Sequence, residues 1–174
     1  DDNLIHVRQV GIRIADQGET AILMIIEPRQ SVVESPYSDT IEESTFLKIF
    51  YDSTQPALLI DNGVVYDCND AQLELLGLKS KEDILTTRVA ELSPLRQPDG
   101  EDSLEKAQRL LAETFEKGSN QFQWTCRRRD GSEVTVEVTL VVVPFRGRQM
   151  IYSMARDLTQ QMQIEQALRH RDGV

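Results

Sequence analysis

The sequence has few of the residues on which most metal, redox and acid–base sites depend. Its two cysteines, Cys68 and Cys126, lie far apart and form no C-x-x-C motif. We therefore expect neither a disulfide framework nor a structural zinc site. The two histidines, His6 and His170, lie near the ends of the chain. Histidine-based catalysis and histidine metal ligands are therefore not expected in the long central part, and no metal site is predicted.

Long apolar stretches are also missing. The longest runs, residues 21–26 and 140–143, are far too short to span a bilayer, and no signal peptide is visible. We therefore expect no membrane contact by this part of the protein. The chain opens without Met and ends inside a helical pattern, so we expect it to be a piece excised from a longer protein.

An excess of positive charge is absent too. The formal net charge is −10, and 40% apolar with 28% charged residues is the composition of a soluble, globular chain. An acidic chain binds polyanions poorly unless it carries a local basic patch. The one candidate patch, residues 127–129, is followed at once by Asp130-Gly131 and reads as a charged turn. Nucleic acid is therefore not an expected partner.

The first part of the chain predicts a β-hairpin and a linker. Residues 5–14 alternate between apolar and polar, residues 16–19 form a turn cluster, and residues 21–26 are continuously apolar. Two strands alone are marginally stable in water, so this hairpin needs something to pack on. Residues 29–39 read as a linker.

The rest of the chain alternates helical and extended patterns. A capping box at Thr40 opens a short amphipathic helix that ends near Ser53, and a two-stranded hairpin turns at residues 61–63. The order of the remaining elements predicts an α+β domain, with a five-stranded antiparallel sheet and short helices on one face. The predicted strands are 57–60, 64–66, 121–128, 133–144 and 149–156. Predicted helices follow Asn69, Asp102 and Asp157, and residues 80–83 and 89–92 predict one or two further helical turns.

Motifs spread along this second unit resemble those of PAS domains. Their order and spacing, from about residue 42 to residue 159, carry the resemblance. The last motif, Asp157-Leu158-Thr159, resembles the Asp-x-Thr signature with which the final PAS strand passes into an output helix. The others are Phe46-Leu47-x-Ile49-Phe50, Pro56-Ala57, Gly63-Val64-Val65, Asn69-x-Ala71, Leu75-Leu76-Gly77, Phe122-x-Trp124 and Arg128-Arg129-Asp130-Gly131-Ser132.

The resemblance implies a PAS domain at residues 40–159, followed at residues 160–174 by the start of a signalling helix. Two interpretations stay open for the hairpin at residues 1–28. It is similar to the closing hairpin of a preceding PAS-like domain, although Asp-x-Thr is not found at residues 26–28. Alternatively, it is an extension that pairs with the sheet edge of this domain or of a partner chain.

The resemblance also implies a space between sheet and helices, and strand alternation assigns the residues that face it. Either these side chains fill the space themselves, or a small ligand binds there. Trp124 carries an indole N–H that needs a hydrogen-bond partner when buried. The residues expected to face the space are Leu111, Phe115, Phe122, Trp124, Cys126, Val136, Val138, Leu140, Ile151, Ser153 and Ala155.

The family's known cofactors do not suit these residues. Haem-binding PAS domains commonly supply an axial histidine from the long helix, but residues 103–117 contain no histidine, methionine or cysteine. Photoreceptor flavin domains carry an Asn-Cys-Arg-Phe motif, which is absent. Cys126, Val136 and Ala155 stand where those domains hold the flavin ring with polar amides. We therefore expect a small apolar ligand or none.

The two cysteines also allow a redox interpretation, against which a structural one is favoured. A thiol buried in apolar surroundings, as expected for Cys126, has a raised pKa and is inert. Cys68 lies just before a predicted helix N-terminus, which favours the thiolate, but a structural role is again expected.

No convergent acid, base or nucleophile is visible, so the chain is not expected to be an enzyme and no catalytic residue is predicted. The carboxylate pairs Glu42-Glu43 and Glu101-Asp102 lie at predicted helix starts, where a solvated charge near the helix dipole explains them.

The resemblance implies a cytoplasmic signal-input domain of a bacterial signalling protein. Its output would pass through Asp157 and Thr159 to a downstream effector in the same polypeptide, such as a histidine kinase or a diguanylate cyclase. The alternative is a ligand-free dimerisation and relay module. This alternative draws on Tyr152 and Met154, which are expected on the outer face of the sheet, where a flanking helix or the second subunit of a homodimer would cover them.

Overall fold

The structure is a computed structural model that describes residues 36–172, with side chains described for residues 42–169. The chain divides into two units, and the described residues from Asp39 onward belong to the second. The β-hairpin expected at residues 5–28 lies outside the described residues. Helix α1, Pro36–Asp52, begins inside the segment that the sequence predicts as a linker. Proline suits a first helical turn because the N–H group that it lacks has no intrahelical partner there.

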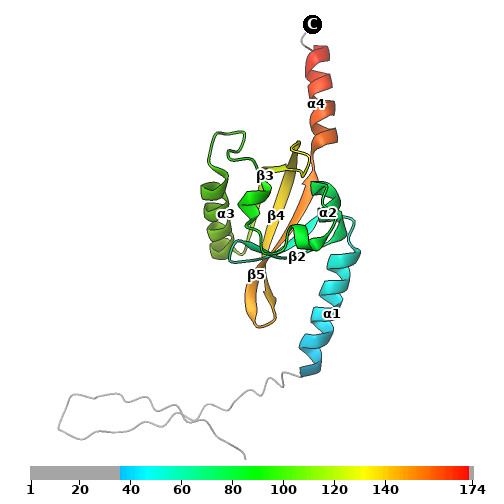
Figure 1. The fold of residues 1–174 in the computed structure, drawn as a ribbon, viewed down its shortest axis with the longest axis vertical. Helices are drawn as coiled ribbons and strands as arrows, with labels where there is room; N and C mark the ends of the chain where they lie inside the picture. Colours follow the sequence, from blue (N-terminus) through cyan, green and yellow to red (C-terminus); the bar gives the residue numbers. More distant parts are fainter. Residues whose placement is uncertain (1–35, 173–174) are drawn as a thin grey trace, which may run out of the picture. The chain divides into compact units, whose positions relative to one another are not determined.

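Five antiparallel strands form one sheet in the order β2-β1-β5-β4-β3, which confirms the predicted sheet (Figure 1). The first strand lies beside the last, so Leu58 of β1 is opposite Ser153 of β5. On the other side of β5, Ser153 is opposite Leu140 of β4. The strands are β1 (Ala57–Asp61), β2 (Val64–Cys68), β3 (Ser119–Arg127), β4 (Glu133–Phe145) and β5 (Arg148–Asp157).

Helical segments cover one face of the sheet, called the inner face below. They are α2 (Asp70–Leu76), the 3₁₀ turns η1 (Lys81–Asp83) and η2 (Val89–Leu92), and α3 (Ser103–Lys117). The carboxylate of Asp102 accepts hydrogen bonds from the backbone N–H groups of Leu104 at 2.9 Å and Glu105 at 3.2 Å, which opens α3 at the predicted cap. Gly118, with a φ of 85°, ends it in the left-handed conformation that glycine adopts without strain.

Asn69 joins three segments at the start of α2. Its side chain is fully buried. The side-chain Oδ1 accepts from the backbone N–H groups of Ala57, at the start of β1, and Gln72, in the first turn of α2, both at 3.0 Å. The side-chain Nδ2 donates to the carbonyl oxygens of Phe50 at 3.1 Å and Gln55 at 2.8 Å. One amide therefore holds the end of α1, the start of β1 and the start of α2.

Helix α1 covers the opposite, outer face, so the expectation that the helices gather on one face holds only for the segments from α2 to α3. Phe46 and Phe50 of α1 pack on Tyr152 of β5, with ring centroids 5.6 Å and 6.0 Å away. Because strand side chains alternate, Leu58 belongs to the core under α2 and α3, whereas its neighbour Leu59 belongs to the core under α1.

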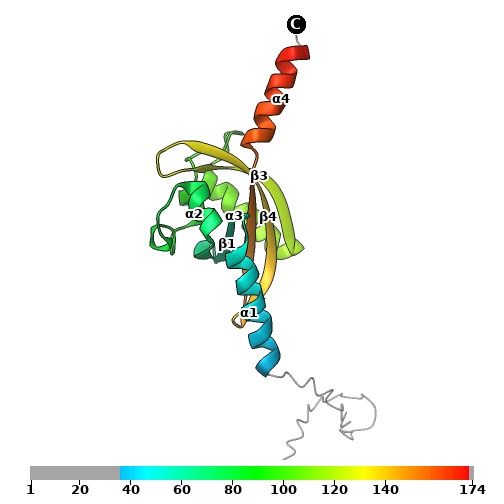
Figure 2. The ribbon, with the colours of Figure 1, turned by 90° about the vertical axis from the view of Figure 1, so that its right-hand side faces the viewer.

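Helix α4, Thr159–Asp172, follows β5 directly and projects away from the sheet (Figure 2). Three of its apolar side chains, Met162, Ile164 and Leu168, are 40%, 54% and 47% exposed. In the part of the chain that the structure describes, no helix has both the length and the apolar character needed to cross a membrane.

Candidate functional site

A cavity of about 80 Å³ lies between the inner face of the sheet and α2, η2 and α3. Its walls are apolar apart from two side chains, Gln72 of α2 and Ser153 of β5. The sheet contributes Leu58, Ile60, Phe122, Trp124, Cys126, Val136, Val138, Leu140, Ser153 and Ala155, and the helical segments contribute Gln72, Leu75, Val89, Leu92, Ala107, Leu110 and Leu111.

Most side chains that the sequence places at the cavity are found in its lining. They are Leu111, Phe122, Trp124, Cys126, Val136, Val138, Leu140, Ser153 and Ala155. Ile151 points to the same side of the sheet and is 1% exposed, but it belongs to the surrounding core and does not line the cavity. The binding of a ligand by these residues stays a prediction.

The prediction that Phe115 faces the cavity is wrong. Its side chain is 44% exposed and does not line the cavity. The buried residues of α3 are Ser103, Ala107, Leu110 and Thr114, and Phe115 lies about 80° around the helix from Ala107 and about 100° from Thr114. The apolar pattern of the sequence does not indicate this buried face, because polar residues, Ser103 and Thr114, occupy its two ends. Thr114 is tolerated there because its hydroxyl donates to the carbonyl oxygen of Leu110 at 2.7 Å.

The part of the wall that β1, α2, η2 and most of α3 supply was not predicted from the sequence. Leu58 and Ile60 follow the same alternation as the other strands, so this pattern was sufficient to find them. Gln72 carries no such signal, because a glutamine in a short helix is ordinarily a surface residue. It is 4% exposed here.

Trp124 finds the hydrogen-bond partner that its burial requires. Its indole Nε1 donates to Oγ of Ser93 at 2.7 Å, and both side chains are buried. Ser93 begins the loop 93–102, which connects η2 to α3. The ammonium of Lys106 lies 6.0 Å from the centroid of the Trp124 ring. The aromatic wall of the cavity is therefore bound to the loop beside it.

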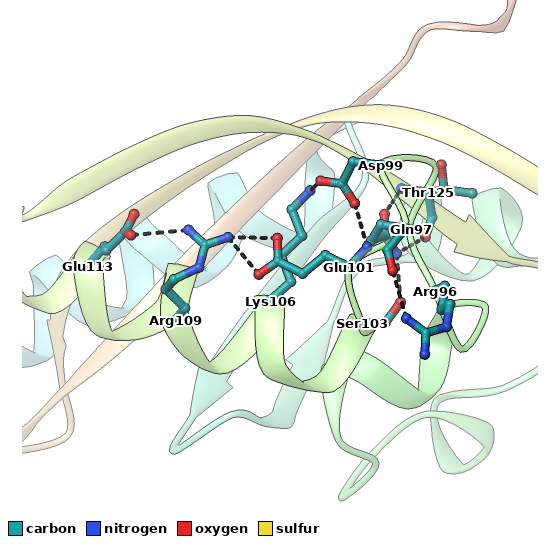
Figure 3. Close-up of polar contacts among 10 residues, drawn as sticks. Arg96, Gln97, Asp99, Glu101, Ser103, Lys106, Arg109, Glu113 and Thr125 are labelled. Atoms are coloured by element: carbon teal, nitrogen blue, oxygen red, sulfur yellow. Dashed lines mark hydrogen bonds and ion pairs between the residues drawn. The ribbon is translucent and has the colours of Figure 1, made fainter.

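Gln97 fastens the same loop to β3 (Figure 3). Its side chain is 3% exposed. The side-chain Oε1 accepts from the backbone N–H of Thr125 at 2.8 Å, and Nε2 donates to the carbonyl oxygen of Thr125 at 3.2 Å and to Oγ of Ser103 at 2.9 Å. The amide thus satisfies main-chain groups on the edge strand β3 that would otherwise lack a partner.

Ion pairs connect the loop to α3 as well (Figure 3). Nζ of Lys106 is 2.6 Å from Oδ2 of Asp99, and the Arg109 guanidinium pairs with Glu101 at 2.9 Å and Glu113 at 3.2 Å. The hydrogen bond from Lys106 is the main cause that holds the pKa of Asp99 below its ordinary value. Because these groups are partly exposed, each pair contributes little stability, and the buried Gln97 is the stronger attachment.

Both cysteines lie in the inner core, and burial governs their chemistry. Burial raises the pKa of the Cys126 thiol to about 12 and that of Cys68 to about 11. Lys81 opposes the shift at Cys68, but desolvation is the larger effect. A thiol that stays protonated at neutral pH is a poor nucleophile, which favours the structural interpretation of both residues.

The cavity does not fit the large cofactors of the family. Pockets that enclose drug-sized ligands measure roughly 300–1,000 Å³, several times the 80 Å³ found here. None of the residues on α3 that line the cavity can bind a haem iron, since they are Ala107, Leu110 and Leu111. Among the residues that the structure describes, no group of three or more His, Cys, Asp or Glu side chains is placed to hold a metal ion.

The predicted output pair lies where β5 passes into α4, with Asp157 ending the strand and Thr159 beginning the helix. Oδ1 of Asp157 accepts from the backbone N–H of Thr159 at 2.8 Å and from its Oγ1 at 2.6 Å, which caps the first turn of α4. Leu158 between them is buried, and its N–H donates to the carbonyl oxygen of Thr135 on β4 at 3.0 Å. The start of α4 is thereby tied to the sheet.

The outer-face residues are placed as the alternation predicts, but α1 covers one of them. Tyr152 packs against Phe46 and Phe50 of the same chain, so α1 covers part of its half-buried side chain. Met154 is half-buried. Of the two coverings considered for this face, the structure contains the flanking helix.

Solved structures share this fold. The PAS domain of an HTR-like protein from Haloarcula marismortui is 24% identical, with a TM-score of 0.55, and the match covers 70% of this chain and 96% of that one. The PAS domain of nitrogen regulation protein NR(II) from Vibrio parahaemolyticus is 19% identical, with a TM-score of 0.51 and coverage of 63% and 94%. An RNA-binding Light-Oxygen-Voltage receptor is 15% identical, with a TM-score of 0.58, and the match covers 97% of this chain and 44% of the receptor.

Likeness at these identities shows the fold alone. The search among curated proteins finds no match. The sequence profile of the PAS domain matches residues 55–160, which is more than half of the chain and includes the whole sheet and the cavity. The chain therefore belongs to the PAS domain family.

Proposed function

We propose that this PAS domain is the cytoplasmic signal-input domain of a bacterial signal-transduction protein. It would report the state of its cavity to a downstream effector in the same polypeptide, such as a histidine kinase or a diguanylate cyclase. PAS domains are sensory and regulatory, so any catalytic activity is expected in the effector. The observation that carries the proposal is that strand β5 both lines the cavity and ends at Asp157 of the output pair.

The route from cavity to output is short. Ser153 and Ala155 line the cavity, and Asp157 caps α4 two residues further along the same strand. A ligand that shifts the end of β5 changes the geometry of this cap, and with it the direction in which α4 leaves the sheet. If α4 leaves the sheet in two directions, the ligand shifts the equilibrium between these two conformations only by the difference in its affinity for them.

Filling the cavity in the full-length protein tests the proposal. Val138→Phe places a larger side chain in the cavity from β4, and we expect an effector output that no longer responds to the stimulus. Val141→Phe makes the same change on the other face of the same strand and should leave the response intact. A response that survives Val138→Phe, in a protein with an unchanged circular dichroism spectrum, would contradict the proposed function.

The alternative is a relay module that dimerises without a ligand. The exposed apolar residues Met162, Ile164 and Leu168 of α4 favour it, because an apolar helix surface gains stability when a second copy covers it. Native mass spectrometry separates the two functions. Extra mass on the 19.8 kDa chain supports ligand input, whereas a bare polypeptide at twice that mass supports the relay module.

A further inference from the structure

Two polar side chains in the cavity wall make no hydrogen bond within the described residues. Gln72 is 4% exposed and Ser153 is 7% exposed, and both line the cavity. Within residues 36–172, neither the carboxamide of Gln72 nor the hydroxyl of Ser153 makes a hydrogen bond. They differ in this respect from the other buried polar side chains near the cavity, Ser93 and Gln97, whose polar atoms are bonded to Trp124 and Thr125.

These polar atoms are not fully enclosed by protein. Every fully enclosed side-chain nitrogen or oxygen in the described part of the chain has a hydrogen-bond partner. The polar atoms of Gln72 and Ser153 without a partner therefore retain some accessible surface, and both residues line the cavity. Leaving a buried amide or hydroxyl without a partner destabilises a protein, so an occupant that supplies the missing bonds stabilises the folded state.

The local structure positions Gln72 before any occupant arrives. Its backbone N–H donates to Oδ1 of Asn69 at 3.0 Å, within the cap that ties α2 to β1. Ser153 lies on the central strand β5, between Leu58 and Leu140. Because both residues lie on fixed backbone, little conformational freedom is lost when they bind.

The size and charge of the cavity restrict what fits. An apolar cavity of about 150 Å³ takes benzene, with six non-hydrogen atoms, so about 80 Å³ takes three or four. No lysine, arginine, histidine, aspartate or glutamate lines the cavity, so an ionised ligand would be buried without a counter-charge. The occupant is therefore small and uncharged.

We propose that the cavity binds a small uncharged molecule of three or four non-hydrogen atoms, with an apolar body and one polar group that hydrogen-bonds to Gln72 and Ser153. A short alcohol, ketone or primary amide has this chemistry. The inference rests on the proposed input function and narrows the ligand that this function senses. A molecule of this size reaches a Kd no tighter than about 0.1 mM, which suits an abundant metabolite or solvent-like compound.

Two probes of similar size and different polarity test the ligand class on the 174-residue chain. The first is 2-propanol, titrated while the ¹H–¹⁵N resonances of the cavity residues are followed by NMR, and the second is xenon, which cannot hydrogen-bond. We expect both to bind in the cavity. Gln72→Met and Ser153→Ala should each weaken 2-propanol binding about fivefold, the effect of one lost hydrogen bond, and should leave xenon binding unchanged.

Gln108→Met is the matched control, because Gln108 is exposed on α3 and does not line the cavity. It should change neither affinity. If xenon binds and 2-propanol does not, or if 2-propanol binds equally well to all variants, the ligand class is wrong while the input function stands. If neither probe binds, the cavity is closed, and the ligand class and the input function both fail.

Discussion

The outer face of the sheet is packed by aromatic rings against α1, whereas the inner face keeps a cavity of about 80 Å³ under α2, η2 and α3. The outer core is built of side chains such as Phe50, Leu59 and Met150, which are 0% exposed. The inner wall includes Gln72 and Ser153, whose polar groups have no partner in the described chain. Close packing supplies stability on one face, and the other face keeps open space and unsatisfied polar groups, which favour a binding role.

The largest expected effect is the loss of an aromatic ring from the outer face. Phe50→Ala leaves a void among Phe46, Tyr152 and the sheet, and we expect it to cost about 3–5 kcal/mol in the free energy of unfolding. Phe122→Ala on the inner face should cost about 1–2 kcal/mol, because Phe122 is only half-buried and already faces the cavity. Urea unfolding measures both, and equal costs would contradict the distinction between the two faces.

A smaller effect is expected from adding side-chain volume, and its sign should differ between the two faces of the sheet. Ala57, 1% exposed, faces the outer core, and Ala155, 7% exposed, faces the cavity. Ala57→Val should destabilise the protein by about 1–3 kcal/mol through overpacking. Ala155→Val has free space to enter and should be neutral or raise the free energy of unfolding by about 0.5–1 kcal/mol. Thermal unfolding compares the pair, and destabilisation of similar size in both would show that the cavity is closed in solution.

The smallest effect appears only at alkaline pH and belongs to the inner face, which holds both cysteines. Their folded pKa values, about 11 for Cys68 and about 12 for Cys126, exceed the ordinary value of 9.0. Above pH 9 the unfolded chain loses thiol protons that the folded chain keeps, so ionisation favours the unfolded state. This contribution to stability is complete below pH 9 and is lost progressively as the pH rises through the folded pKa values, about 11 for Cys68 and about 12 for Cys126.

Cys126→Ala should reduce that loss. The urea midpoint of the variant should fall less between pH 8 and pH 10.5 than that of the parent chain, and the difference between the two curves removes the contribution of tyrosine ionisation. Parallel curves would mean that the Cys126 thiol titrates normally in the folded protein.

The sheet was predictable from the sequence because its signals are local and repeat along each strand. Alternation and the turn at Asp61-Asn62-Gly63 gave the strands and assigned Val136, Val138 and Ala155 to the inner face. The face of α3 that is buried was not predictable in this way. Its buried stripe includes Thr114, a residue that is acceptable there only because it bonds to Leu110 in its own helix.

Other features depend on contacts between distant segments. The polar residue Gln72 is buried beside a cavity that the sheet, η2 and α3 also line, and the sequence of its own helix does not indicate these neighbours. The side of the sheet that α1 covers is likewise set by the rings that meet Phe46 and Phe50, which come from β4 and β5. Local patterns predict which apolar residues share one face of a strand or helix. Tertiary packing decides which other element covers that face.

The bonds of Asn69 have a consequence for how this domain opens. Its Oδ1 accepts hydrogen bonds from the backbone N–H groups of Ala57 and Gln72. Its Nδ2 donates to the carbonyl oxygens of Phe50 and Gln55. None of these segments can separate from the others without exposing a partner of the same buried amide. The end of α1, the first strand and the start of α2 therefore form one cooperative opening unit, although residues 53–56 separate α1 from β1.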